Sequence, residues 1–437
     1  MSGDLKRRDF LSAGALGAGL LVLRSGMLKA APSDKLNLAG IGIGGRGWGD
    51  INGCASENVV ALCDVNKKNL ARAAKKWPQA KTYEDWRKCL EQKDIDAVVC
   101  ATTDHTHAFV NVWAMNRGKH VYCEKPLANS VEEANLVRQT YLKNKGKLAT
   151  QMGTQIHATA NYRRMVEMVR GGAIGTPQSV RVWCSRMPKG GSYLPKAGDP
   201  PDWLNWDLWI GPAPMHDYNP GYVGGCLKWN RFWDFGSGQI GDMGSHMMDM
   251  AYWALDLALP TTCKAEGSPI STDTVPTWLT AEWEHPKNDW RPAVKVSWHD
   301  GGKKPGLPSK VFYRDGMFKG TLFKGDKGYL IADYGYRILM PTSGDMTHYK
   351  APKSAADLIP PSPGHHQEWL IGCKTGKPPL CNFDYAGAMI ENNLLALVAY
   401  RVGKKLEWDS ANLKAKGCPE ADKFIRKQYR KGWVLNG

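Results

Sequence analysis

Five short apolar runs alternate with polar stretches between residues 35 and 155, and this alternation constrains the fold more than any other feature of the chain. The polar stretches between them, such as residues 66–77 and 130–146, are rich in helix-forming residues. Apolar strands that alternate with helices indicate a parallel sheet covered on both faces. We therefore expect an α/β domain at residues 35–155, with its strands at KLNLAGIGIG, NVVALCDV, IDAVVCAT, HVYCEKP and KLATQMG.

The pattern changes from residue 156 onward. Longer segments of alternating polarity appear there, namely LTAEWEH, AVKVSWHD, MFKGTLFKGDKGYLIAD and YRILMP. Such segments predict a large, mostly antiparallel open sheet with one solvated face. A Pro-, Gly- and Trp-rich region at residues 187–235 interrupts the pattern. We expect an α+β domain for substrate binding and oligomerisation at residues 156–410, followed by a C-terminal tail at residues 411–437.

A glycine-rich loop follows the first apolar run and carries the pattern Gly42-x-Gly44-x-x-Gly47. Glycines here permit a tight turn and let backbone N–H groups approach a pyrophosphate at a helix N-terminus. Asp64 closes the second run, where an acid can accept hydrogen bonds from the adenosine ribose hydroxyls. The combination predicts a dinucleotide-binding Rossmann domain that prefers NAD, with NADP still possible. The loop residues expected to contact the cofactor are Gly42, Gly44, Gly45, Arg46 and Gly47.

Two further motifs carry chemistry. The fourth run ends in Glu124-Lys125-Pro126, which leaves a lysine at the carboxyl edge of the parallel sheet, where a nicotinamide would lie. The stretch GDMGSHMMD, residues 241–249, sets Asp242 and His246 four residues apart on one helix face, and Asp249 follows one turn later. We interpret Asp249 as a structural partner.

Three interpretations of Asp242 and His246 are open: a metal site, a structural pair or proton transfer. Zinc sites of this kind usually have a second histidine on the same helix, and none is present, although His365, His366 and Glu368 could complete a distant site. A histidine with an ordinary pKa of about 6.5 suits the removal of a hydroxyl proton near neutral pH. We favour proton transfer, with Asp242 holding the imidazole or the substrate in place, and expect no metal.

Together these pieces resemble the Gfo/Idh/MocA family of nicotinamide-dependent sugar and polyol oxidoreductases. The matching segments are the glycine loop, ATTDHTHAFV, CEKPLA and GDMGSHMMD, and the resemblance spans residues 36–410. It implies a Rossmann domain joined to a domain with an open sheet, and a catalytic Lys125 with Asp242 and His246 as partners. Thr103 departs from the family by replacing a frequent proline, and PPDWLNWDLWIGPAP looks like the loop of exported members.

Other residues are weaker candidates. Near the nicotinamide we expect Thr102, His107, Glu124 and Lys125 to contact the cofactor. Residues that could reach a substrate are His105, Gln151, His157 and Trp203. For the histidines and for the aromatic residues of the Trp-rich region, packing within a loop is an equally good interpretation.

The N-terminus, residues 1–31, has the pattern of a twin-arginine signal: Arg7-Arg8, an apolar stretch and small residues near Ala30-Ala31. A cytoplasmic chain with an apolar first helix is the alternative. We expect a periplasmic or otherwise exported protein, without a stable membrane span once the signal is removed.

The formal net charge of +16 comes from scattered lysines and arginines without a nucleic-acid-binding motif, so we expect no nucleic-acid partner. Eleven cysteines at irregular spacing, with no C-x-x-C pair, argue against a disulfide framework. We expect a homo-oligomer, a dimer or a tetramer.

The leading hypothesis is therefore an exported NAD(P)-dependent oxidoreductase. It would transfer hydride between a secondary hydroxyl of a sugar, glycoside or cyclitol and a tightly bound nicotinamide. One alternative is a glycosidase or lyase that oxidises its substrate transiently and then eliminates the aglycone, as some relatives in the family do. Another is a catalytically silent sugar-binding protein.

Overall fold

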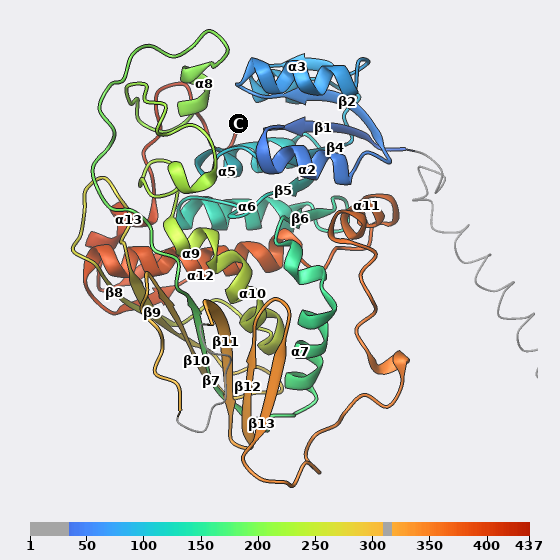
Figure 1. Cartoon of the computed structure of the whole chain (residues 1–437), viewed down its shortest axis with the longest axis vertical. Coiled ribbons are helices and arrows are strands. Elements are labelled where there is room, and N and C mark those ends of the chain that lie inside the picture. Colours follow the sequence, from blue (N-terminus) through green and yellow to red (C-terminus); the bar gives the residue numbers. More distant parts are fainter. Residues whose placement is uncertain (1–34, 309–316) are drawn as a thin grey trace, which may run out of the picture. The chain divides into compact units, whose positions relative to one another are not determined.

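Six parallel strands form the first sheet of the computed structural model, which describes residues 35–308 and 317–437 (Figure 1). Their order is β3-β2-β1-β4-β5-β6, and every pair is parallel. The strands are β1 (Asn37–Ile41), β2 (Asn58–Cys63), β3 (Lys81–Tyr83), β4 (Ala97–Cys100), β5 (His120–Cys123) and β6 (Thr150–Met152). The expected Rossmann-type sheet is confirmed, while the signal at residues 1–31 lies outside the described residues.

Helices connect these strands and cover the sheet. They are α2 (Gly45–Gly53), α3 (Lys67–Lys76), α4 (Trp86–Leu90), α5 (Asp104–Asn116) and α6 (Val131–Lys143). Side chains of Asn66, Asp85 and Ser130 accept hydrogen bonds from the first turns of α3, α4 and α6. Helix α2 starts after Gly44 and has no side-chain cap, so its first N–H groups stay available to a ligand.

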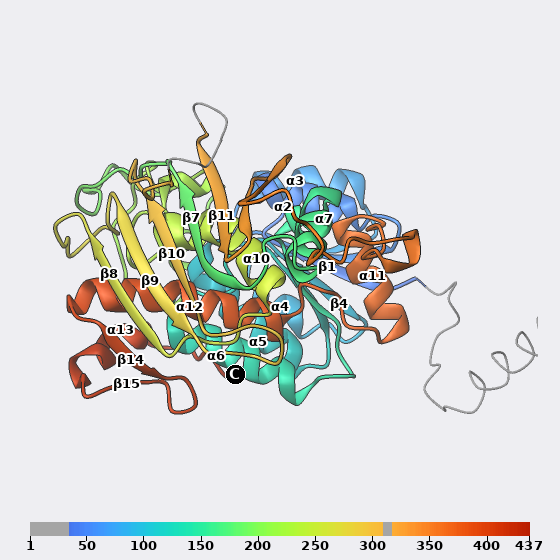
Figure 2. The ribbon, with the colours of Figure 1, turned by 90° about the horizontal axis from the view of Figure 1, so that it is seen from below.

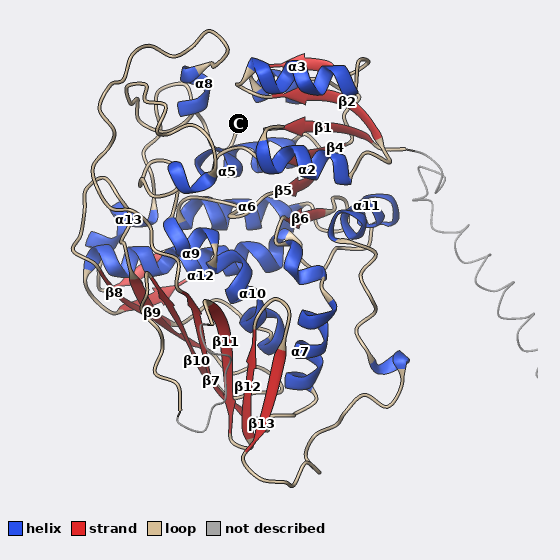
Figure 3. Cartoon of the chain, in the orientation of Figure 1, coloured by secondary structure: helices blue, strands red, loops and turns tan. Residues whose placement is uncertain are grey.

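The second sheet has nine strands in the order β13-β12-β11-β7-β10-β9-β8-β14-β15 (Figure 3). They are β7 (Pro177–Cys184), β8 (Thr262–Gly267), β9 (Leu279–His285), β10 (Val294–Asp300), β11 (Lys319–Gly325), β12 (Gly328–Ala332), β13 (Arg337–Pro341), β14 (Leu406–Asp409) and β15 (Lys414–Lys416). Only β7 and β10 pair in parallel, which confirms the mostly antiparallel sheet. The expected boundary between the α+β domain and the C-terminal tail, at residue 410, falls inside the β-hairpin formed by β14 and β15.

Two helices cover the inner face of this sheet. Helix α10 (Gly244–Leu255) is buried along its whole length, and α12 (Phe383–Val402) packs against both β8 and α6 (Figure 2). In β9 the buried residues Leu279, Ala281 and Trp283 alternate with half-buried polar residues, as the period of a strand requires. The motif at residues 241–249 is therefore held between the two sheets.

The remaining helices are short or lie at the periphery. They are α7 (Ala160–Arg170), α8 (Trp206–Ile210), α9 (Gly238–Asp242), α11 (His365–Thr375) and α13 (Asp422–Ile425), with 3-10 turns at η1 (Gln155–Ala158), η2 (Cys226–Lys228), η3 (Ala355–Asp357) and η4 (Pro419–Ala421). The C-terminal tail packs on the first domain, where Trp433 contacts Trp86 and Phe109. Within the described ranges, no helix combines the length and apolar composition that a membrane crossing requires. All eleven cysteines are free.

Candidate active site

A cavity of about 750 Å³ opens at the carboxyl ends of β1, β2, β4 and β5. Its size lies in the range of small-molecule and cofactor sites. The glycine loop and Asp64 line it on one side, and Lys125 and His246 line it on another. The fold therefore brings the cofactor motif and both reactive motifs to one space, as the crevice rule for parallel sheets predicts.

The glycine loop can be built only from glycine at two positions. Gly42 has a φ of +76°, and a Cβ at this residue would lie 2.6 Å from the carbonyl oxygen of Ala101. A Cβ on Gly47 would lie 1.8 Å from the carbonyl oxygen of Gly42. By contrast, nothing lies within 4 Å of a Cβ on Gly45, which lines the cavity. The tight turn thus leaves open space in front of the N-terminus of α2, where a pyrophosphate fits.

Asp64 is buried at the end of β2 with its carboxylate facing this cavity. Its Oδ2 accepts hydrogen bonds from the N–H of Ile43 at 3.0 Å and from Asn69 Nδ2 at 3.0 Å. Its Oδ1 accepts one bond, from the N–H of Asn66 at 2.8 Å. Since a carboxylate oxygen accepts two bonds, Oδ1 can take one more from a ribose hydroxyl. The residues present therefore fit NAD, and a 2′-phosphate would meet a carboxylate.

Arg46 and Glu124 form an ion pair at the wall of the cavity. Arg46 Nε donates to Glu124 Oε1 at 3.0 Å, and another nitrogen of the guanidinium lies 2.8 Å from Asp50. Burial raises the pKa of Glu124 to about 7, and the nearby Asp50 adds to the rise. Both residues line the cavity or its edge as expected, although Arg46 already has two acidic partners.

Asp242 is shared by two cations. Lys125 Nζ pairs with Asp242 Oδ1, and Arg186 donates to Asp242 Oδ2 at 2.9 Å. Burial by itself lowers the pKa of Lys125, but Asp242 and Glu124 outweigh it and hold the pKa above its ordinary value. Burial likewise opposes ionisation of Asp242, yet Lys125 and Arg186 hold its pKa below the usual range. Lys125 is therefore a cation at neutral pH, and the carboxylate positions it.

This arrangement corrects one expected role. We expected Asp242 to hold the imidazole or the substrate, but Asp242 binds Lys125 and Arg186 instead. The imidazole of His246 is held by Thr154, whose Oγ1 lies 3.0 Å from His246 Nδ1. Residues four apart on a helix lie on the same face. Asp242 and His246 nevertheless bind different partners, because Lys125 and Arg186 lie next to the first and Thr154 lies next to the second.

The Thr154 contact sets the tautomer of His246. The Thr154 hydroxyl donates its single hydrogen to the carbonyl oxygen of Ser245 at 3.2 Å, so it accepts the hydrogen bond from His246 Nδ1–H. Nε2 is then the unprotonated nitrogen, able to take a proton. Burial lowers the pKa of His246 to about 3, and the positive charges of Lys125, Arg46 and Arg186 contribute. The imidazole is therefore neutral over the physiological range.

Thr102 and His107 also line the cavity as expected. His107 Nδ1 lies 2.7 Å from the carbonyl oxygen of Pro126, and its Nε2 lies 3.1 Å from that of Thr102. Because it links the loops that follow β4 and β5, His107 shapes the cavity wall next to Lys125. Burial lowers its pKa to about 4.

Four residues that we expected near a substrate lie elsewhere. His105 contacts the carbonyl oxygens of Trp209 and Ile210 and lines a separate, smaller cavity. Gln151 donates to the carbonyl oxygen of His365. The other two, His157 and Trp203, contact Asp249 and Lys68 respectively. None of the four lines the large cavity, because partners within the fold already hold each side chain.

The described residues around Asp242 and His246 do not form a group of metal ligands. Among the described residues, two groups of three side chains lie close enough to share an ion: Cys100, His107 and Cys123, and His157, Asp249 and Cys381. Neither includes Asp242 or His246. The distant completion considered above does not form, because His365 contacts the carbonyl oxygen of Met152 and His366 contacts Asp50.

Several residues at the site were not singled out from the sequence. Arg186 follows β7 in a segment with no motif, and Cys226 and Asp104 line the cavity beside Lys125. Tyr334 lies against His246, with ring centroids 6.1 Å apart. No local pattern marks these residues, because the folding of distant segments alone brings them to the site.

Comparison with known proteins decides the family. Residues 36–152 match the family described as "Oxidoreductase family, NAD-binding Rossmann fold", and residues 164–288 match its "C-terminal alpha/beta domain". The two matches together cover more than half of the chain. The chain belongs to the Gfo/Idh/MocA oxidoreductase family. The resemblance is thereby confirmed, and the first domain is an NAD-binding domain whose cofactor is NAD. Membership of an exported subgroup stays a prediction.

Two curated relatives in this family show the range of its chemistry. The chain is 32% identical over 130 residues to an inositol 2-dehydrogenase of Salmonella typhimurium, covering 30% of this chain and 38% of the relative. It is 29% identical over 198 residues to a levoglucosan dehydrogenase of Pseudarthrobacter phenanthrenivorans, covering 44% of this chain and 40% of the relative. The matches thus span less than half of each relative.

Solved structures of the family share the fold. The WlbA dehydrogenase from Bordetella pertussis, in complex with NADH and UDP-GlcNAcA, aligns with a TM-score of 0.60 and 16% identity, over 87% of this chain and 99% of that chain. An aldose-aldose oxidoreductase from Caulobacter crescentus aligns with a TM-score of 0.55 and 18% identity, over 86% of this chain and 100% of that chain. At these identities the likeness concerns the fold alone.

The role of Thr154 can be tested by replacing its hydroxyl. Thr154→Val leaves the Nδ1–H of His246 without an acceptor, which costs about 1–3 kcal/mol for a buried donor. We expect turnover to fall about 10- to 100-fold, with KM little changed and the pH profile altered. Steady-state kinetics across pH measure this. Thr154→Ser is the matched control and should keep most of the activity; wild-type turnover with an unchanged pH profile in Thr154→Val would refute the role.

Proposed function

We propose that this protein transfers hydride between a secondary hydroxyl of a sugar, glycoside or cyclitol and a tightly bound NAD. The observation that carries the proposal is the convergence of Lys125, His246 and the glycine loop on one cavity. A dinucleotide site alone would fit many functions. A cationic lysine beside a neutral imidazole restricts the chemistry to a hydroxyl or carbonyl group next to the cofactor.

The side chains divide the reaction between them. When bound, NAD accepts the hydride from the carbon that carries the hydroxyl group. His246 Nε2 takes the hydroxyl proton, since it is the unprotonated nitrogen of the imidazole. Lys125 donates a hydrogen bond to the same oxygen and stabilises its developing negative charge. Asp242 keeps Lys125 charged and in place, because it is the ion-pair partner of Nζ.

The names of the relatives support this substrate class. Inositol 2-dehydrogenase and levoglucosan dehydrogenase both act, by their names, on ring compounds that bear hydroxyl groups. Their matches cover under half of each relative, so the substrate of this chain is inferred from the site. A cation and a neutral base next to a nicotinamide suit such a hydroxyl in either direction of the reaction.

A clasp over the adenosine end supports tight binding of the cofactor. The clasp consists of residues 203–205 of the Trp-rich region and residues 65–67 after β2. Its backbone bonds run from Lys67 N to the carbonyl oxygen of Trp203 at 2.8 Å and from Asn205 N to that of Val65 at 2.9 Å. Leu204 forms a β-bridge with Asn66 and also lines the cavity. We propose that release of a dinucleotide through this end is slow while these bonds hold.

The clasp predicts how long the cofactor is retained. The double substitution Trp203→Ala and Asn205→Ala removes the ring that packs on Lys68 and the side chain that bonds Glu84. We expect NAD to dissociate at least about 10-fold faster, since roughly 1.4 kcal/mol gives a factor of ten. The measurement is NAD remaining after timed dialysis, determined by mass spectrometry. Met215→Ala, at an exposed position of the same region, is the control. Equal retention in all three proteins would contradict the clasp.

The reaction itself is tested with Lys125→Ala and His246→Ala. Each should slow reduction of bound NAD by roughly 10²- to 10⁴-fold, the usual scale for a positioned base or an electrostatic group. Absorbance at the nicotinamide band during incubation with polyols and aryl glycosides measures this, and NAD content checks the fold. Wild-type rates in both variants would refute the assignment. Aglycone release by the wild type without net redox change would favour the transient-oxidation glycosidase instead.

We also propose that the protein is exported through the twin-arginine pathway. This pathway transports folded proteins, so a cofactor held by the clasp would travel with the chain. The support is the sequence pattern of residues 1–31, with Arg7 and Arg8 followed by an apolar stretch. Replacing both arginines by lysine should leave the protein in the cytoplasmic fraction of the host, and unchanged fractionation would contradict the proposal.

A further inference from the structure

Two cations belong to the neighbouring strands β7 and β11 or to the segment that follows them, at the end of the second sheet that faces Asp242 and Tyr334. They are Arg186, two residues after the end of β7, and Lys319, the first residue of β11. Lys319 is the register partner of Cys184, so it lies on the same face of the sheet as Cys184. That face is the one covered by α10, because Thr321, two residues along β11, donates to the carbonyl oxygen of Met247.

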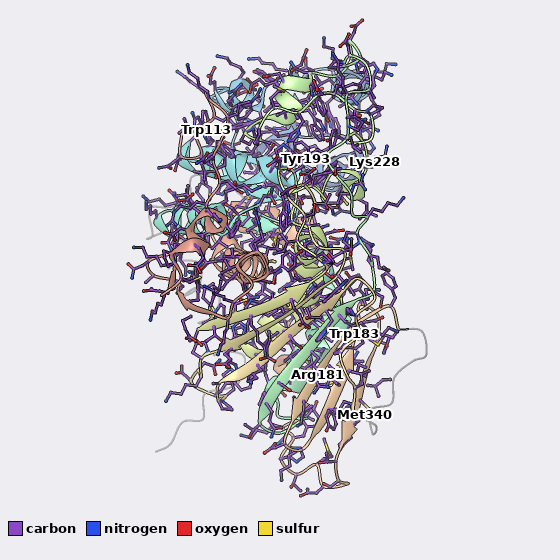
Figure 4. The ribbon with its side chains drawn as sticks, turned by 90° about the vertical axis from the view of Figure 1, so that its left-hand side faces the viewer. Trp113, Arg181, Trp183, Tyr193, Lys228 and Met340 are labelled. Atoms are coloured by element: carbon purple, nitrogen blue, oxygen red, sulfur yellow. The ribbon has the colours of Figure 1, made fainter. Side chains whose placement is uncertain are left out.

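The opposite face is separate from the site. Trp183 on β7 packs with Met317, Leu322 and Ile331 in a cluster of its own, while Val182 and Cys184 belong to the main core with α10. Figure 4 shows Trp183 and Arg181 on this strand. Side chains alternate along a strand, so Lys319, the register partner of Cys184, lies on the face opposite to Trp183. Arg186 lies beyond the end of β7, and its hydrogen bond to Asp242 directs it toward the site.

Tyr334 connects these cations to the catalytic imidazole. Lys319 Nζ lies 4.4 Å from the centroid of the Tyr334 ring, and that ring is 6.1 Å from the His246 ring. The hydroxyl oxygen of Tyr334 is buried and has no hydrogen-bond partner within the described residues. A buried hydroxyl normally finds a partner, so this group is a donor that a bound ligand can satisfy.

Arg186 and Lys319 have one carboxylate as an ion-pair partner between them, among the described residues. Of the carboxylates that the structure describes, Asp242 alone pairs with Arg186, and Arg186 shares it with Lys125. Arg186 keeps a side chain that is 35% exposed, with one hydrogen bond to a side chain of the described protein. Lys319 has no ion-pair partner in the part of the chain that the structure describes. Among the described residues, Asp242 is thus the one carboxylate within ion-pair distance of Lys125, Arg186 or Lys319, although Glu124 also helps to keep Lys125 charged.

We infer that the substrate carries an anionic substituent, a carboxylate or a phosphate, which binds between Arg186 and Lys319 with Tyr334 as a further donor. The inference rests on the proposed function and names the substrate class of the same site. A guanidinium with free N–H groups binds carboxylate and phosphate through paired hydrogen bonds, and a lysine adds a point charge. The hydroxyl to be oxidised then lies near Lys125 and His246.

The anion also serves the chemistry. Lys125, Arg46 and Arg186 help to lower the pKa of His246, which makes the imidazole a weak base. A negative charge beside Arg186 favours the protonated form of a nearby group and so raises its pKa. An acidic substrate therefore strengthens the base that acts on it, whereas a neutral substrate of the same shape does not.

The experiment compares acidic and neutral sugars of matched shape. The purified protein with its cofactor is titrated with D-glucose, D-glucuronate and D-glucose 6-phosphate, and with D-galactose and D-galacturonate. Tryptophan fluorescence reports binding, and absorbance reports reduction of bound NAD. We expect at least one acidic sugar to bind about 10-fold or more tightly than its neutral counterpart at low salt, with the difference shrinking as salt rises. Comparing D-glucose 6-phosphate with D-glucuronate shows whether the site prefers a phosphate or a carboxylate.

Matched lysine variants identify the site. Lys319→Gln should remove most of this preference, while Lys324→Gln, on the same strand but the opposite face, should keep it. The inference is overturned if no acidic sugar is preferred in any pair, or if both variants keep the same preference. Reduction of bound NAD by neutral sugars alone would leave the proposed function standing and the inference refuted. Preferential binding of acidic sugars without any reduction of NAD would support the inference and contradict the proposed function.

Discussion

The ion pair between Lys125 and Asp242 joins the two halves of the site. Lys125 follows a strand of the parallel sheet, and Asp242 ends a short helix that packs beneath the antiparallel sheet. Neither charge is well solvated, so each depends on the other for its ionised form. The raised pKa of the buried Lys125 therefore depends on Asp242, and so on the contact between the two domains. Arg186 extends the same dependence to the edge of the second sheet.

The alternation of apolar and polar segments predicted both sheets. Apolar residues recur about every two residues in a half-buried strand and about every three to four in a helix, so the two patterns can be told apart. The glycine loop and Asp64 were predictable for a related reason. A tight turn needs glycine at Gly42 and Gly47, and the position of an acid after the second strand follows from the topology. The grouping of Lys125 with Asp242 and His246 was implied by the family resemblance, and the spacing within each motif did not show that the two motifs meet.

Other parts of the site depend on contacts between distant segments. Lys319 and Arg186 are more than a hundred residues apart in sequence, and only the pairing of β7 with β11 brings them together. Gln151 lies within β6 and His157 lies in the 3-10 turn η1 after it, yet contacts with His365 and Asp249 hold them in the interior. The sequence likewise did not show what the aromatic residues of the Trp-rich region contact. Its aromatic rings pack mainly on one another, as with Trp206 stacked on Trp209, and composition alone does not distinguish this from a sugar-binding wall.

If the clasp retains NAD as proposed, the order of events in a catalytic cycle follows from it. A dinucleotide that remains bound is a prosthetic group, so oxidised and reduced protein are two forms of one molecule. Each donor must leave before an acceptor can enter the same cavity, and the two half-reactions alternate. Initial rates measured against donor at several acceptor concentrations then give parallel double-reciprocal lines. Such a protein draws on no pool of free nucleotide, and one copy of the cofactor serves for the lifetime of the folded chain.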